Sequence, residues 1–262
     1  MNVRIFHGWG AFFGAAAALF FLLWSPTDAS TIAVSPVQLY LSRGNSSTEL
    51  TITNQSVEPI RFSVSGYSWT QSTTNPLILR STSDLVFFPA LFSIAAGQQK
   101  HVRIGTTAEA ASVETAYRII VEELPPLSSV LGNRTSGAGL SIRTRVSLPL
   151  FLKPSHQTMS AEFNDPQVHH GALSFSLINT GNVHLQVPKI LVDASDRQGR
   201  IFSTTLNGWY VLPGTTHRFS VRIPKGHCQA ISRLNFRFLS EDLSVKQEFA
   251  RVGIDCSTAA PP

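Results

Sequence analysis

Short runs of alternating apolar and polar residues, separated by turn-forming residues, recur along almost the whole chain. Examples are residues 50–53, 62–64 and 173–177, where every second residue is apolar. A period of two is typical of a β-strand with one buried face, because successive side chains point to opposite sides of the sheet. No long segment combines a helical apolar period with capping residues. The pattern therefore predicts an all-β protein.

The first 29 residues have the layout of a secretory signal peptide. Arg4 precedes an apolar run over residues 11–23, and the small residues around Ala29 suit a cleavage site. The alternative is an uncleaved membrane anchor, but the run is shorter than the roughly 20 apolar residues that span a bilayer. We expect residues 1–29 to be removed, leaving an exported chain that is not an integral membrane protein.

The remaining chain carries two sets of predicted strands. Seven short strands end at Lys153-Pro154, and their number and turn spacing fit an immunoglobulin-like sandwich. A second set of alternating runs begins after Ser155. The sequence therefore predicts two immunoglobulin-like β-sandwich domains, residues 30–154 and 155–262, joined by a linker short enough to hold them at a fixed angle.

The only two cysteines, Cys228 and Cys256, both lie near the C-terminus. An even number of cysteines in an exported chain favours a disulfide between them, with two buried free thiols as the alternative. No CxxC motif is present, so neither a redox motif nor a four-cysteine zinc site is supported.

Composition and motifs argue against several classes of function. The net charge of +5 is scattered, and an exported protein rarely meets nucleic acid, so it indicates solubility and attraction for carboxylate-bearing partners. The sequence has no GxSxG, P-loop, HExxH or glycine-rich dinucleotide motif. The pair His169-His170 is interpreted as a solvated turn rather than a metal site. We therefore predict a protein that is not an enzyme and has no cofactor and no metal.

Residues 140–153 form a long, regular predicted strand that follows a Ser- and Gly-rich loop. A strand this regular is a candidate edge that a partner could recognise, and the loop leaves its start free to move. One face carries Ser141, Arg143, Arg145 and Ser147. The other face carries Leu140, Ile142, Thr144, Val146 and Leu148.

Several short motifs, in a fixed order, resemble the periplasmic chaperones of chaperone–usher pili. They span nearly the whole mature chain and are most similar to the archaic or alternative branch that assembles Csu-type pili. The motifs are Ser35-Pro36-Val37, residues 50–54, 95–98 and 102–104, Tyr117-Arg118 with residues 123–126, and residues 146–151 and 179–182.

The resemblance implies two domains in an L or boomerang shape, in the periplasm of a Gram-negative bacterium. It implies a chaperone that captures pilus subunits and delivers them to an outer-membrane usher. A pilin that lacks its last strand exposes an apolar groove and an unpaired edge, which a donated chaperone strand would complete. Leu140, Ile142, Val146 and Leu148 would then fill subunit pockets, with Thr144 as a weak position; packing in the first domain's own core is the alternative. The alternative function is an exported immunoglobulin-like adhesin or structural pilus component.

In the best-studied chaperones of this family, an arginine of the first strand and a lysine of the seventh anchor the subunit's terminal carboxylate. Leu39 and Pro149 occupy those positions here, so the resemblance implies that another cation replaces them. The candidates, in order of preference, are Arg118, Arg145, Arg143 and Arg103.

The family also has a charge network between its two domains. Glu114 and Lys153 fall where two of its members belong, with Glu241 or Asp242 as the third. Buried together, these groups would fix the interdomain angle, whereas an exposed pair would contribute only about 0–1 kcal/mol.

Overall fold

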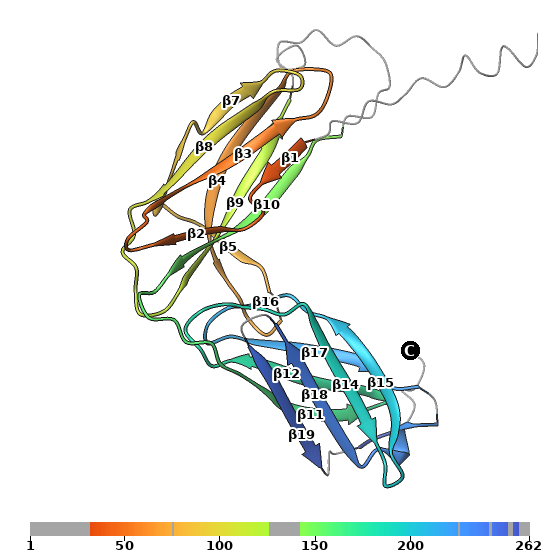
Figure 1. Ribbon diagram of the computed structural model, residues 1–262. Coiled ribbons are helices and arrows are strands. Elements are labelled where there is room, and N and C mark those ends of the chain that lie inside the picture. Colours follow the sequence, from red (N-terminus) through yellow and green to blue (C-terminus); the bar gives the residue numbers. More distant parts are fainter. Residues whose placement is uncertain are drawn as a thin grey trace, which may run out of the picture.

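The computed structural model describes residues 32–74, 76–125, 142–224, 226–240, 243–250 and 254–256. The expected signal peptide, Leu140, Glu241 and Asp242 lie outside the described residues. The strands form two sandwiches that meet at an angle (Figure 1). The predicted all-β class and the angled pair of immunoglobulin-like sandwiches are confirmed. Within the described ranges, no helix has the length and apolar character needed to cross a membrane.

The N-terminal sandwich packs two sheets around one apolar core. Its buried residues alternate along the strands as the sequence predicts, for example Leu50 and Ile52. One sheet has the order β1 (Ile32–Ser35), β3 (Ser47–Asn54), β8 (Gln99–Thr106), β6 (Leu85–Phe88). The other has the order β2 (Leu39–Ser42), β10 (Arg145–Lys153), β9 (Thr115–Leu124), β4 (Ile60–Thr70), β5 (Ile78–Ser81), with β7 (Leu91–Ile94) also paired to β4.

The opening strand changes sheets at Pro36. The segment before it, β1, pairs antiparallel with β3, whereas β2 pairs in parallel with β10. A proline has no N–H to donate, so the break between the two ladders falls where a backbone hydrogen bond is missing in any case. The switch places Leu39 beside Leu150, in the core of the first sandwich.

The C-terminal sandwich is built in the same way around a second core, which includes Phe175 and Phe236. Its first sheet has the order β11 (Ala161–His169), β12 (Ala172–Asn179), β17 (Thr216–Arg222). Its second has the order β15 (Arg200–Asn207), β14 (Lys189–Ser195), β18 (Arg233–Leu239), β19 (Ser244–Ala250). The short strands β13 (Leu185–Gln186) and β16 (Tyr210–Val211) pair with each other. Because β10 ends at Lys153 and β11 begins at Ala161, we propose the predicted domain boundary between Pro154 and Ser155.

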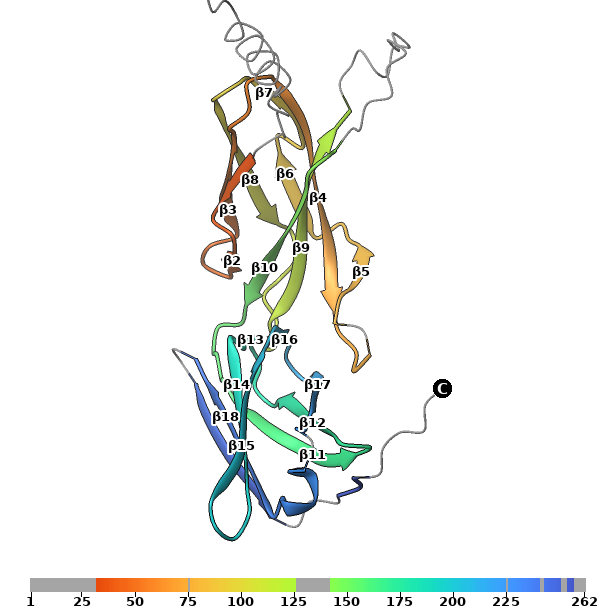
Figure 2. The same cartoon turned by 90° about the vertical axis from the view of Figure 1, so that its right-hand side faces the viewer.

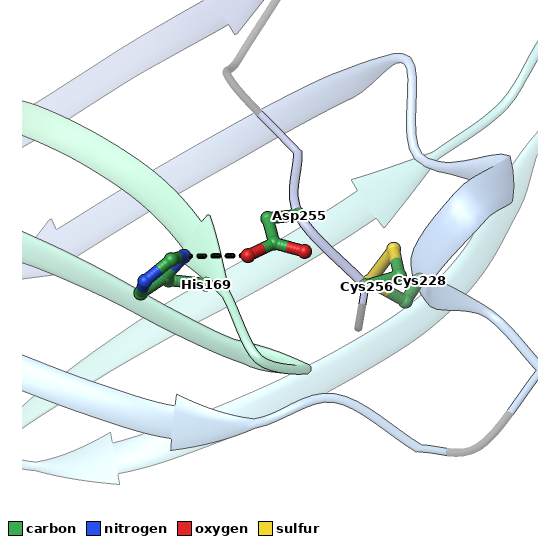
Figure 3. The surroundings of a disulfide bond; sticks show 4 residues. All are labelled: His169, Cys228, Asp255 and Cys256. Atoms are coloured by element: carbon green, nitrogen blue, oxygen red, sulfur yellow. Dashed lines mark ion pairs between the residues drawn. A yellow bond between two sulfur atoms is a disulfide. The ribbon is translucent and has the colours of Figure 1, made fainter. Parts of the chain in front are cut away.

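Cys228 and Cys256 form a disulfide, as the sequence predicts. Cys228 opens the short 3₁₀ helix η2 (Cys228–Ala230), and the bond holds the C-terminal segment against it (Figure 3).

Replacing both cysteines by serine should lower the free energy of unfolding of the C-terminal sandwich by about 3–4 kcal/mol, because the link closes a loop of 28 residues. Urea unfolding of the oxidised wild type and the double variant measures the difference. Reduction of the wild type should reproduce the loss and leave the variant unchanged. Equal stability of the two oxidised proteins would contradict the prediction.

The two sandwiches are joined by hydrogen bonds and by an apolar cluster. Gln71, just after β4, donates from Nε2 to the carbonyl oxygen of Tyr210 at 2.9 Å and accepts at Oε1 from the N–H of Leu212 at 2.8 Å. The N–H of Glu114 donates to the carbonyl oxygen of Asn182 at 2.9 Å. These bonds, made by both sides of the junction, fix the angle between the sandwiches. The cluster consists of Trp69, Ala116, Phe151 and Leu212, with Leu79 and Tyr210 packed against it.

Candidate functional site

Strand β10 has one edge that is only partly paired. It pairs with β9 from Arg145 to Leu152, but with β2 only from Leu150 to Lys153 (Figure 2). Thr144 directs its carbonyl oxygen toward β9, where it accepts from the N–H of Glu123 at 2.9 Å. The N–H and C=O groups of successive strand residues point to alternate edges of the strand. Those of Arg145 and Ser147 therefore point to the edge opposite β9, which no described strand covers. An added strand could pair there.

Exposure falls steeply along residues 142–148; β10 begins only at Arg145, later than the predicted start at residue 140, so Ile142 and Thr144 precede the strand. Ile142 is 70% exposed, Thr144 and Val146 are half-buried, and Leu148 is only 4% exposed and belongs to the N-terminal core. The assignment of Leu148 to a subunit pocket is therefore wrong, because that side chain is already buried by its own domain. Ile142 stays available to a partner, Val146 is half-buried and packs against the same core, and Leu140 lies outside the described residues.

Arg118, in the middle of β9, is a buried cation with unsatisfied donors. It is only 4% exposed, and its Nε and Nη2 atoms have no hydrogen-bond partner among the described residues. Burial lowers the pKa of Arg118 from its usual range. Its Cζ lies 3.8 Å from the ring centroid of Trp69, a cation–π contact that offsets part of the lost hydration. Nε–H and Nη2–H lie side by side on a guanidinium, the arrangement that binds a carboxylate in a bidentate manner. Both atoms are covered in the free protein, however, so a carboxylate reaches them only if neighbouring side chains move.

The register of the sheet explains how Arg118 can act where the family's lysine is absent. Arg118 on β9 lies directly opposite Pro149 on β10, so the two side chains are neighbours on the same face of the sheet. A buried cation on β9 therefore lies beside the position that the resemblance assigns to the lysine.

The other three arginines of the candidate set do not share this environment. Arg143 and Arg145 are exposed near the start of β10, several residues from Pro149, and Arg103 is exposed on β8, in the other sheet. The Nη2 of Arg103 donates to the Oγ of Ser47 at 3.1 Å. The structure therefore does not bring the four arginines together, and Arg118 remains the anchor that we propose.

Two aromatic residues of the C-terminal sandwich complete the surroundings of Arg118. Its Cζ lies 5.7 Å from the ring centroid of Trp209 and 5.8 Å from that of Tyr210. Trp209 is about half exposed, and burial raises the pKa of Tyr210, so its phenol stays neutral and can donate a hydrogen bond. The sequence did not identify this contribution, because residues more than 90 positions from Arg118 meet it only when the sandwiches dock.

Glu114 has a different partner from the one expected. Its Oε1 accepts from the backbone N–H of His184 at 2.9 Å and lies 2.7 Å from the ring Nδ1 of that residue. The His184 ring stacks on Phe151 with centroids 3.6 Å apart. Lys153 instead places its Nζ 4.0 Å from the ring centroid of Tyr40, and no ion pair joins it to Glu114 in the described part of the chain. The expected Glu114–Lys153 link is thus replaced by Glu114–His184.

Glu114 and Lys153 nevertheless line one cavity of about 340 Å³ between the sandwiches, next to Ser240. The second oxygen of Glu114, Oε2, is buried and lacks a hydrogen-bond partner among the described residues. Glu241 and Asp242 follow Ser240 but lie outside the described residues, so their place in a charge network stays a prediction.

Replacing Glu114 with alanine should destabilise the junction by about 1–3 kcal/mol, because it leaves the backbone N–H of His184 buried without an acceptor. Urea unfolding followed by tryptophan fluorescence measures the loss, since Trp69 and Trp209 both lie close to the junction. Glu109→Ala, an exposed glutamate five residues earlier, is the matched control. Equal unfolding midpoints for the two variants would show that the Glu114–His184 contact is not stabilising.

The chain thus combines an angled pair of immunoglobulin-like sandwiches with a partly unpaired edge strand, which lies beside a buried cation in the first sandwich. Residues 31–158 match the family model described as pili and flagellar-assembly chaperone, PapD N-terminal domain. The first sandwich, residues 31–158, therefore belongs to this chaperone family. No curated protein sequence matches the chain.

Solved structures with the same fold include three fimbrial chaperones. The class 5 fimbriae chaperone CfaA is 16% identical, with a TM-score of 0.54 over 86% of this chain and 100% of that chain. A second match is the CsuC–CsuE chaperone–tip adhesion subunit pre-assembly complex from archaic Csu pili of Acinetobacter baumannii. It has 16% identity and a TM-score of 0.54 over 84% of this chain and 98% of that chain. The match to the Salmonella enterica SafA pilin complex with the SafB chaperone has 14% identity and a TM-score of 0.55, over 86% and 98%. At these identities the likeness concerns the fold.

Proposed function

We propose that this protein is a periplasmic chaperone that captures pilus subunits by donating β10 and delivers them to an outer-membrane usher. The observation that carries the proposal is the combination of an unpaired edge on β10 with a buried, unsatisfied Arg118 on the neighbouring strand. A disulfide and the predicted signal peptide agree with an oxidising, extracytoplasmic location. Fimbrial chaperones of the same fold have been solved with pilus subunits.

The two parts of the site suit the two ends of one bound strand. In the proposed complex, the terminal carboxylate of the subunit meets the Nε–H and Nη2–H of Arg118 and replaces the hydration lost on burial. From Pro149, opposite Arg118, to Ile142 is about 24 Å at the rise of an extended strand. A last subunit strand of about seven residues would therefore reach Ile142 while pairing with Arg145 and Ser147.

The sequence has no P-loop to bind a nucleotide. The exposure of the donated residues accounts for the release of a captured subunit without one. Ile142 and Val146 supply only part of an apolar strand, because Leu148 remains in the chaperone's core. The next subunit could offer a strand whose side chains all fill the groove. Handover would then be driven by the better final packing of the subunit.

Co-expression tests the function. A pilus subunit encoded beside this chain should accumulate as a soluble one-to-one complex in the periplasm with the chaperone and aggregate or be degraded without it. Equal soluble yield in both cases would overturn the proposal. A subunit that purifies alone while this chain is incorporated into surface fibres would favour the structural pilus component.

A further inference from the structure

A cluster of two imidazoles and one carboxylate lies at the far end of the C-terminal sandwich from the junction. His169, His170 and Asp255 each offer a metal-ligating atom, and these atoms lie within 4.8 Å of one another. The ring centroids of the two histidines are 4.1 Å apart, and Nδ1 of His169 lies 2.8 Å from Oδ2 of Asp255 (Figure 3). We call these three residues the His169 site.

The hairpin turn brings two consecutive histidines together. The sequence placed this pair in a turn, where a solvated loop is more common than a metal site. His170 and Gly171 both have positive φ angles, 49° and 72°, as the two-residue turn between β11 and β12 requires. Histidine is one of the residues other than glycine that adopt this left-handed conformation more readily, so His170 suits the turn.

The carboxylate comes from a distant segment that is fixed in three ways. Ile254 forms a parallel bridge with Val168, and the N–H of Asp255 donates to the carbonyl oxygen of Val168 at 2.8 Å. The next residue, Cys256, is bonded to Cys228 (Figure 3). Asp255 is therefore held beside the turn by backbone pairing and by a covalent link, so little ordering is needed when a ligand binds.

We propose that the His169 site binds a divalent transition-metal ion, with Zn²⁺ as the reference ion, through one atom each of His169, His170 and Asp255. Two imidazoles and a carboxylate are ligands that Zn²⁺ takes in sites with an open fourth position. Ligand atoms around a tetrahedral Zn²⁺ lie about 3.3 Å apart. The His169–Asp255 contact must therefore open by about 0.5 Å, which these exposed side chains allow. The bound ion would tie the hairpin to the C-terminal segment, a role separate from subunit capture.

Calorimetric titration of the oxidised, tag-free mature chain with ZnCl₂ tests the site. One equivalent should bind with a dissociation constant below about 100 μM. His170→Asn, which keeps a residue that tolerates the turn, and Asp255→Asn should each weaken binding about tenfold or more. His101→Asn is the matched control, because His101 also pairs with a carboxylate, that of Glu49 at 2.9 Å, but belongs to no three-ligand cluster among the described residues.

Circular dichroism of each variant before titration confirms that it is folded. Thermal unfolding provides a second measurement that does not depend on the heat of binding. Zn²⁺ should raise the unfolding midpoint of the wild type and of His101→Asn, but not that of His170→Asn. The proposal is overturned if the wild type binds no Zn²⁺ below millimolar concentration. It is also overturned if His170→Asn and Asp255→Asn bind as tightly as His101→Asn.

Discussion

Arg118→Ala should weaken subunit capture about 100-fold or more, a loss of about 3 kcal/mol, because it leaves the subunit's carboxylate buried without a cation. Arg118→Lys should retain part of the affinity, since an ammonium keeps the charge but not the bidentate geometry. Trp69 lies against the guanidinium, so tryptophan fluorescence gives a direct reading of binding. Arg103→Ala, which removes an exposed arginine of the same domain, is the control and should bind like the wild type.

A subunit peptide with an amidated C-terminus separates the anchor from a general effect on the fold. Amidation should weaken binding to the wild type about as much as Arg118→Ala does, and it should add little in the variant. If amidation costs the same affinity in both proteins, Arg118 does not bind the carboxylate.

Ile142→Asp is expected to remove the soluble complex altogether, because a carboxylate would have to enter an apolar subunit groove. Ile142→Ala should lower affinity by about 10-fold to 100-fold, the effect of losing a buried aliphatic side chain. Val57→Asp is the matched control, since Val57 is 71% exposed and Ile142 is 70% exposed. Co-purification of the subunit measures all three variants. An undiminished complex with Ile142→Asp would exclude this residue from the donated strand.

The local sequence pattern predicted the two sandwiches well, but it did not predict which apolar residues of the 140–153 segment are buried in the core. Alternation placed Val146 and Leu148 on one face correctly, because the side-chain period of a strand is fixed by the backbone. It did not show that the second sheet covers Leu148 and leaves Ile142 exposed, since that depends on where the sandwich ends. The core packing that was kept as an alternative therefore holds for Leu148.

The junction could be predicted only in part, because its contacts join residues far apart in sequence. Glu114 was placed between the domains from the resemblance, and the structure buries it there. Its partner His184 follows a turn 70 positions later, and nothing local distinguishes that histidine from a solvated one. The contact of Trp209 with Arg118 likewise has no local signal in the sequence. The pairing of Arg118 with Pro149 depends on the register between β9 and β10, which local pattern does not give.

Hydrogen exchange of the chaperone, free and with a captured subunit, tests donation of β10 most directly. The amides of Arg145 and Ser147 point to the unpaired edge and should exchange quickly in the free protein. We predict that capture slows both by at least about 100-fold while exposed edges of the C-terminal sandwich are unchanged. Protection of another edge, such as β6 or β15, with Arg145 and Ser147 still exchanging as in the free protein, would contradict the account.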